Sequence, residues 1–274
     1  MANVLPMEKQ ITVIGALAEG NSIRAIERMT GVNRNTIMSL GLRVGHGCER
    51  LLDERMRGLD CKAIQMDEIW GFIGKKQRKV TIDDSSEVGD IWTFIAVDAD
   101  SKIVPCYKVG KRDLATATAF VCDLASRVID RIQLSSDALR TYVPAVERGF
   151  GCDVDYGQLI KTYATSSEYP ENRYSPGDVI STEKSVITGN PDQAKISTSY
   201  VESQNLTLRM HCRRLTRLTN AFSKKLDNLK AAIGLHFGYY NFVKRHNTLR
   251  MTPAMAAGIE PSFWSVADLI ERAK

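Results

Sequence analysis

The feature that most constrains the fold of this chain is a short apolar segment, residues 62–71 (KAIQMDEIWG), which ends in two acids and an aromatic residue. Its apolar and β-favouring side chains predict a buried strand, so Asp67 would lie inside a sheet. Burying an unpaired carboxylate costs several kcal/mol unless a metal ion, a cation or hydrogen bonds compensate for the lost solvation. Two interpretations follow: Asp67 binds a metal ion, or Asp67 or Glu68 only ends the strand at a solvated edge.

The size and composition of the chain indicate a globular protein. Its 274 residues, 43% of them hydrophobic and 25% charged, suit one large domain or two modest ones and exclude a wholly disordered chain. No apolar run approaches the roughly 20 residues that span a bilayer, and the N-terminus lacks a signal-peptide pattern. We therefore expect a cytoplasmic protein without a membrane partner. Its six cysteines form no C-x-x-C pair, which predicts reduced thiols rather than a zinc knuckle or disulfides.

The N-terminal residues predict helices separated by glycine turns. Helix-like spacing of apolar residues occurs three times within residues 7–42, and Gly20 and Gly31 are placed to end the first two helices. Residues 42–58 would follow as a polar helix or a linker. The order resembles a helix-turn-helix, although an ordinary three-helix packing unit is the alternative. In the first interpretation four side chains would face DNA: Arg34, Asn35, Thr36 and Ser39.

A β-hairpin is predicted in the middle of the chain. Residues 90–98 (DIWTFIAVD) are rich in β-branched and aromatic side chains and form the clearest strand of the sequence. A turn at residues 99–101 leads into residues 102–109 as the antiparallel partner strand. Asp98 is then explained by turn chemistry rather than by catalysis.

A second acid is predicted at the end of another strand. Asp113 can cap an Ala-rich helix, and residues 131–137 (RIQLSSD) follow as a short strand that ends in Asp137. Residues 153–163 can supply a further strand. The polar residues 166–197, rich in Ser, Pro and Gly, predict an insertion of loops.

The predicted elements follow the order expected of a ribonuclease-H-like α/β fold: a strand with an acid, a hairpin, a helix and a second strand with an acid. In this fold a mixed sheet with flanking helices brings two strand-end acids into one site, and ligands bind beyond the carboxyl ends of the strands. We therefore expect a helix-turn-helix domain and linker at 1–58 and a ribonuclease-H-like catalytic domain at 59–274. The catalytic domain would contain the polar insertion at about 166–197 and a basic helical part at 199–274.

A third acid follows the insertion. Glu202, Asn205 and Arg209 are spaced to share one helix face, which would point a carboxylate, an amide and a cation toward the sheet edge. The alternative is a capping box, in which Ser199 and Glu202 only satisfy backbone N–H groups at a helix start. Both interpretations can hold at once.

The positive charge of the chain is concentrated near its C-terminus. Residues 203–250 contain ten Lys or Arg against Asp227 alone, although the whole chain carries only +5. Such a segment suits a polyanion, and a solvated basic helix face is the alternative. The loop 74–79 (GKKQRK) is also basic and either contacts phosphates or is simply solvated. The candidate phosphate contacts are Lys75, Lys76, Asn205, Arg209, Arg213, Arg214, Arg217, Lys224 and Lys225.

Three carboxylates suit phosphodiester cleavage or transfer assisted by two divalent metal ions about 3.5–4 Å apart. Carboxylate oxygens bind hard cations, so Mg²⁺ is the expected cofactor. Asp67 could bridge both ions while Asp137 and Glu202 each hold one.

Several segments together resemble DDE transposases of the insertion-sequence-one family. They are residues 67–70 (DEIW), 92–98 (WTFIAVD), 136–137 (SD) with Tyr142, 200–206 (YVESQNL), 214–217 (RLTR), 222–225 (FSKK) and a tail, 240–253, that looks like the ending of many bacterial transposases. The resemblance implies a ribonuclease-H-like catalytic domain with Asp67, Asp137 and Glu202 as its triad, and dependence on Mg²⁺ or Mn²⁺.

The resemblance also implies the reaction and its partners. A chain of this family would bind the terminal inverted repeats of an insertion element, assemble as at least a dimer on paired DNA ends, and join the cleaved 3′-hydroxyls to target DNA in the nucleoid. Two other functions remain open: a nuclease or junction resolvase with the same fold, and a catalytically inactive DNA-binding regulator.

Overall fold

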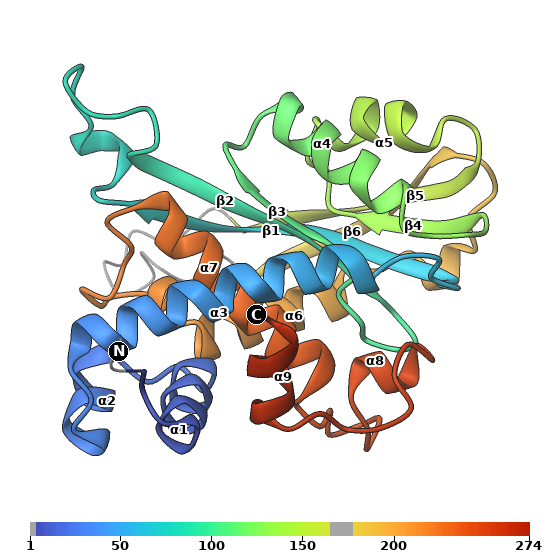
Figure 1. Ribbon diagram of the computed structural model, residues 1–274. Helices are drawn as coiled ribbons and strands as arrows, with labels where there is room; N and C mark the ends of the chain where they lie inside the picture. Colours follow the sequence, from blue (N-terminus) through green and yellow to red (C-terminus); the bar gives the residue numbers. More distant parts are fainter. Residues whose placement is uncertain (1–3, 165–177) are drawn as a thin grey trace.

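In the computed structural model, which describes residues 4–164 and 178–274, a single sheet divides the helices into two layers. Helices α4 and α5 lie on one face of the sheet, and α3, α6 and α7 lie on the other (Figure 1). The main elements are α1 (Met7–Ala18), α2 (Ile23–Thr30), α3 (Arg34–Arg55), β1 (Ala63–Ile73), β2 (Gly89–Asp98), β3 (Tyr107–Gly110), α4 (Leu114–Ala125), β4 (Ile132–Ser136), α5 (Tyr142–Phe150), β5 (Val154–Tyr163), β6 (Val179–Thr188), α6 (Ser199–His211), α7 (Leu226–Phe242), α8 (Pro253–Ala256) and α9 (Val266–Arg272).

The sheet has the strand order β3-β2-β1-β4-β5-β6. Strands β1, β2 and β3 pair antiparallel, β4 and β5 run parallel to β1, and β6 pairs antiparallel with β5. The predicted α/β class with a mixed sheet and flanking helices is confirmed, and this order is consistent with a ribonuclease-H-like fold.

The predicted hairpin is present but shorter than expected. The regular ladder with β2 contains only Tyr107–Gly110, although the backbone N–H groups of Asp98 and Ala96 also donate to the carbonyl oxygens of Ile103 at 3.0 Å and Cys106 at 3.3 Å. Before these contacts the chain makes a turn in which the Asp98 Oδ2 atom accepts hydrogen bonds from the Ser101 backbone N–H at 2.8 Å and hydroxyl at 2.6 Å. The interpretation of Asp98 as a turn residue is confirmed.

The prediction that residues 166–197 are only loops is wrong for the part that the structure describes. Residues Val179–Thr188 form β6, which bonds to β5 at the edge of the sheet. Most β6 side chains are exposed, so the strand lacks the alternating apolar and polar pattern that marks a half-buried strand. Residues 166–177 lie outside the described residues.

The third N-terminal helix continues well beyond residue 42, where the helix-like spacing of apolar residues ends. Helix α3 extends through the predicted helix or linker to Arg55 and packs along α7. A Cβ atom at Gly45 would lie 2.1 Å from the Ala231 carbonyl oxygen, and one at Gly238 would lie 2.8 Å from the Cys48 Sγ atom. Glycine is therefore required for the close approach of these two helices.

The buried apolar side chains form one continuous core. It extends from Val13 of α1 through the sheet to Ala273 beside α9. No described helix is both long and apolar enough to cross a membrane. The domain boundary at residue 58 stays a prediction.

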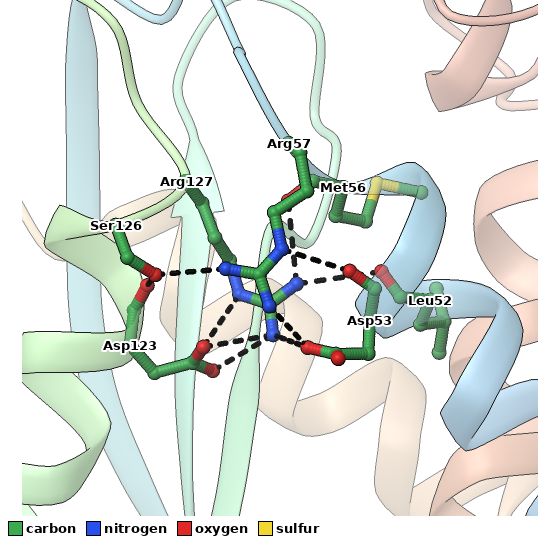
Figure 2. Close-up of polar contacts among 7 residues, drawn as sticks. All are labelled: Leu52, Asp53, Met56, Arg57, Asp123, Ser126 and Arg127. Carbon is green, nitrogen blue, oxygen red and sulfur yellow. Dashed lines mark hydrogen bonds and ion pairs between the residues drawn. The ribbon is translucent and has the colours of Figure 1, made fainter.

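A buried arginine joins the end of α3 to the end of α4 (Figure 2). The Arg127 side chain is 6% exposed, and its Nη1 atom donates to the carbonyl oxygens of Leu52 at 3.3 Å and Met56 at 3.2 Å. Its other nitrogens bind the carboxylates of Asp53 at 2.7 Å and Asp123 at 2.9 Å. The guanidinium thus pairs with the carbonyl group of Met56, just past the end of the helix, and adds a second hydrogen bond to the Leu52 carbonyl group, which already accepts the Met56 N–H.

Replacing Arg127 should destabilise the fold more than replacing its exposed neighbour Arg57, whose side chain is 41% exposed. We expect Arg127→Met to lower the free energy of unfolding by about 2–3 kcal/mol, because two carboxylates and two carbonyl groups lose a buried partner. Arg57→Met should cost less than about 1 kcal/mol. Urea denaturation measures both, and equal losses would contradict the assigned role of Arg127.

Candidate active site

The ends of two parallel strands create the candidate site. Strand β1 pairs with β4 only from Ala63 to Met66, opposite Gln133 to Ser136, while β1 continues alongside β2. Asp67 is therefore the first residue of β1 beyond this ladder, and Asp137 is the first residue after β4. Because parallel strands end at the same edge, the two acids emerge side by side at the carboxyl end of β4.

Three carboxylates meet at this edge. Asp67, Glu68 and Asp137 each offer a carboxylate oxygen, and these oxygens lie within 4.8 Å of one another. The structure thus brings together the two acids that the sequence placed at strand ends, and it adds Glu68, which the sequence interpretation did not assign to the site.

Glu68 is held by a cation and a phenol. Its Oε1 atom accepts hydrogen bonds from the Arg112 Nε atom at 2.8 Å and Nη2 atom at 2.6 Å, and its Oε2 atom accepts one from the Tyr142 hydroxyl at 3.0 Å. The Arg112 guanidinium in turn lies 4.6 Å from the centre of the Trp92 ring. Burial raises the pKa of Glu68, and the contacts with Arg112 and Tyr142 oppose that rise.

Asp67 pairs with no cation among residues 4–164 and 178–274. Burial, with the nearby charges of Glu68 and Asp137, raises its pKa to about 7. Burial also raises the pKa of Asp137, although the Asp137 Oδ1 atom accepts a hydrogen bond from the Leu139 backbone N–H at 3.0 Å. The site therefore concentrates negative charge that is only partly compensated by the protein.

Helix α6 is fixed over this edge by a side chain of β1. The Gln65 Oε1 atom accepts hydrogen bonds from the backbone N–H groups of Tyr200 at 2.8 Å and Val201 at 3.2 Å, which are unpaired groups in the first turn of α6. One and two turns further on, Asn205 and Arg209 reach β1. The Asn205 Nδ2 atom donates to the Asp67 Oδ2 atom at 2.7 Å, and the buried Asn205 Oδ1 atom has no partner among the described residues.

Glu202 lies beside the cluster but outside the group of oxygens within 4.8 Å. Its Oε1 atom accepts a hydrogen bond from the Thr198 hydroxyl at 2.5 Å and pairs with the Lys161 ammonium group, and its side chain is 46% exposed. Its charge still contributes to the raised pKa values of Asp67 and Asp137. Thr198, not Ser199, precedes the helix, and it makes no capping bond, so the capping box is absent here.

The other predicted DNA contacts are dispersed over the surface. Those on α3 are exposed at its start: Arg34, Asn35, Thr36 and Ser39. Four cations of the basic segment are exposed as well: Arg213, Arg217, Lys224 and Lys225.

Contacts with other described residues are seen for Arg209, Lys75, Lys76 and Arg214. The Arg209 guanidinium donates to the carbonyl oxygens of Trp70 and Leu215. Lys75 pairs with Asp84 at 2.7 Å. In addition, Lys76 lies over the Trp70 ring and Arg214 donates to the Ser223 hydroxyl.

Comparison with known proteins gives a distant structural likeness. No family model matches the chain, and no curated protein sequence matches it. Among solved structures it is similar to a chain of the "Cryo-EM structure of piggyBac transposase synaptic complex with hairpin DNA", with a probability of 1.00, a TM-score of 0.42 and 10% identity over 97% of this chain and 69% of that chain.

The raised pKa of Asp67 makes stability depend on pH. Folded Asp67 keeps its proton up to about pH 7, whereas the unfolded chain releases it near pH 3.8, so the unfolding free energy falls as the pH rises between these values. At about 1.4 kcal/mol per pKa step, the loss reaches up to about 4 kcal/mol above pH 7.

In metal-free buffer, Asp67→Asn should therefore be more stable than the wild type at pH 8, by about 2–4 kcal/mol, and within about 1 kcal/mol of it at pH 4. Urea denaturation at the two pH values measures the difference. Asp100→Asn, in an exposed turn, is the control and should change stability by less than about 0.5 kcal/mol at both. If Asp67→Asn changed the stability equally at both pH values, the pKa of Asp67 in the folded protein would not be raised.

Proposed function

We propose that this protein is a DDE-type transposase that cleaves DNA strands at the ends of an insertion element and joins their 3′-hydroxyls to target DNA. The observation that carries the proposal is the meeting of Asp67, Glu68 and Asp137 at the carboxyl ends of β1 and β4. A structural role would not require three acids to be gathered where burial and mutual repulsion oppose their ionisation.

The donor atoms at the site suit a hard divalent cation. Carboxylate and amide oxygens are the ligands that Mg²⁺ and Mn²⁺ take, and the partnerless Asn205 Oδ1 atom adds a buried amide oxygen next to Asp67. Asp67 and Asp137 would hold the metal, with Glu202 as the third ligand of the proposed triad. When bound, Mg²⁺ would neutralise the carboxylates and polarise the phosphodiester that is to be broken.

The surrounding residues fix the orientation of these ligands. Arg112 and Tyr142 hold Glu68, and the Asn205 amide donates a hydrogen bond to the Oδ2 atom of Asp67. Glu68 is already neutralised by Arg112, so its proposed role is to support the site.

The proposed DNA contacts lie on two surfaces. Exposed polar side chains at the start of α3 would enter a groove of the duplex in a helix-turn-helix arrangement, and the basic segment that includes Arg213 and Lys224 would contact phosphates. Two copies of the protein on paired element ends, in the nucleoid, complete the proposal; these features rest on the resemblance to the insertion-sequence-one family.

A nuclease or resolvase is the second candidate, because the same cluster of acids would support hydrolysis without strand joining. A regulator that only binds DNA is the third. The three functions differ in the products they form on DNA.

Linear DNA carrying the ends of the protein's own element should be cleaved and joined to target DNA only when Mg²⁺ is present. Asp67→Asn and Asp137→Asn should each lower the rate of cleavage at least about 100-fold, because each removes a negative charge that would bind the cation. Glu202→Gln should lower the rate to a similar extent if Glu202 is the third member of the triad. Glu183→Gln, on the exposed face of β6, is the control and should retain activity.

Metal binding is measured independently by thermal unfolding. Mg²⁺ should raise the Tm of the wild type and of Glu183→Gln but not that of Asp67→Asn, because a ligand stabilises only the state that binds it. Cleavage without joining would favour the nuclease, and binding of the DNA ends without cleavage or joining, by the wild type as well as the variants, would favour the regulator.

The DNA contact proposed for α3 is tested by salt dependence. If Arg34 contacts a phosphate, Arg34→Gln should reduce the slope of log affinity against log salt concentration by about 0.9 on duplex DNA. Arg148→Gln on α5, at the opposite face of the sheet, removes the same charge and should leave the slope unchanged. Equal slopes for Arg34→Gln and the wild type would remove this contact from the interface.

A further inference from the structure

A large cavity lies where the N-terminal helices meet the C-terminal basic segment. Its volume is about 680 Å³, and its walls come from α1, α2 and α3 on one side and from the end of α6, residues 212–224 and α7 on the other. We refer to it as the junction cavity. Ligand pockets typically fall between about 300 and 1,000 Å³, so its size suits a small organic ligand.

The junction cavity is positively charged. Arg24, Arg213, Arg214 and Lys224 line it, and no acidic side chain does so among the described residues. Arg24, Arg213 and Lys224 are exposed and have no acidic partner within residues 4–164 and 178–274. These three cations are available to an anionic ligand, and guanidinium groups suit phosphate in particular.

The inner walls are apolar and include an aromatic ring. Ile23, Ile37, Met38 and Leu235 contribute aliphatic surface, and Phe222 contributes a phenyl ring. The Phe222 ring is held by Phe72 of β1, with ring centres 4.7 Å apart. A flat apolar group fits such walls, because it buries surface on both of its faces.

A buried imidazole without partners completes the lining. His236 is only 4% exposed, and neither of its ring nitrogens has a hydrogen-bond partner among the described residues. Burial lowers the pKa of His236 to about 3, so the ring is neutral and carries one donor and one acceptor. Leaving both unpaired costs free energy that a ligand with hydrogen-bonding edges would recover. The amides of Asn220 and Asn228 also line the cavity.

An anion, a flat apolar body and an edge with donors and acceptors describe a nucleotide. We propose that the junction cavity binds a single unstacked nucleotide, with its phosphate near Arg24, Arg213 and Lys224 and its base between the apolar walls within reach of His236. That this nucleotide belongs to the DNA substrate rests on the proposed function.

The position of the cavity favours a nucleotide of the DNA strand that is processed at the acids. Phe72, which supports the Phe222 ring, lies five residues beyond Asp67 on β1, or about 17 Å at the rise of an extended strand. That span corresponds to about five nucleotides at 3.4 Å each. One DNA strand can therefore reach both the carboxylates and the cavity, which would place an unpaired nucleotide of the element end a few positions from the reacting bond.

The test compares DNA ends that do or do not offer an unpaired nucleotide. Full-length protein in EDTA is titrated with a blunt duplex and with the same duplex carrying a three-nucleotide single-stranded overhang. The overhang should bind at least about fivefold more tightly, because the blunt end cannot fill the cavity without unstacking a base. Free dAMP and dTMP are titrated as competitors to separate a free nucleotide from a strand-borne one.

Matched variants assign any preference to the cavity. Arg24→Gln and the cavity-filling Met38→Trp should abolish the preference for the overhang, whereas Arg28→Gln, which removes the same charge one turn along α2 outside the lining, should retain it. His236→Phe should reduce the preference, and its Tm shows whether it folds. Asp67→Asn should retain the preference, so failure of cleavage and failure of nucleotide binding are distinguished.

Photocrosslinking locates the nucleotide directly. An overhang containing 5-iodo-deoxyuridine should crosslink to peptides that contain residues 211–238 or 17–42. Competition by free dAMP or dTMP that matches the overhang would support the nucleotide site and identify its ligand as a free nucleotide. Equal affinity for blunt and overhanging DNA without competition by mononucleotides, or crosslinks only to other peptides, would overturn the proposal.

Discussion

The candidate site depends on where the parallel ladder between β1 and β4 ends. Because the last pair is Met66 with Ser136, the next residue of each chain segment is an acid that leaves the ladder at the same level. Strand β1 continues beside β2, so Asp67 stays on a rigid element while Asp137 enters a turn held by the Leu139 N–H group. A shift of one residue in this register would turn Asp67 to the other face of the sheet and separate it from Asn205.

A second constraint is the packing of α3 against α7 and α4. Glycine at position 45 lets α3 approach α7 at Ala231, and Arg127 holds the far end of α3 to α4. In the N-terminal half of α3, Ile37 and Met38 line the junction cavity, and so does Ala231 of α7. The cavity thus borders the place where α3 and α7 approach most closely.

The sequence predicted the strand-end acids well, because a buried strand that ends in a carboxylate is a local pattern. It could not predict Glu68 as part of the cluster, since neighbouring residues of a strand point to opposite faces and only the early end of β4 lets both carboxylates reach Asp137. Strand β6 was missed because its side chains are exposed on both faces. The sequence left residues 42–58 open between a polar helix and a linker, because the glycines of α3 weaken a helix locally, whereas long-range contacts require them, with Ala231 of α7 at Gly45 and with Ala273 at Gly47.

The contrast between Glu68 and Glu202 bears on how the proposed site would accept a cation. Glu68 is buried and pairs with Arg112, whose side chain is 41% exposed, so moving Glu68 would break this ion pair and the hydrogen bond from the Tyr142 hydroxyl. Glu202 is nearly half exposed and pairs with a lysine, an interaction worth at most about 1 kcal/mol in water. A cation bound between Asp67 and Asp137 would attract Glu202 more strongly than Lys161 does, whereas Glu68 would stay in place. In the proposed site, Glu68 would therefore stay fixed beside the metal ligands, and Glu202 is the acid that could move to become the third ligand.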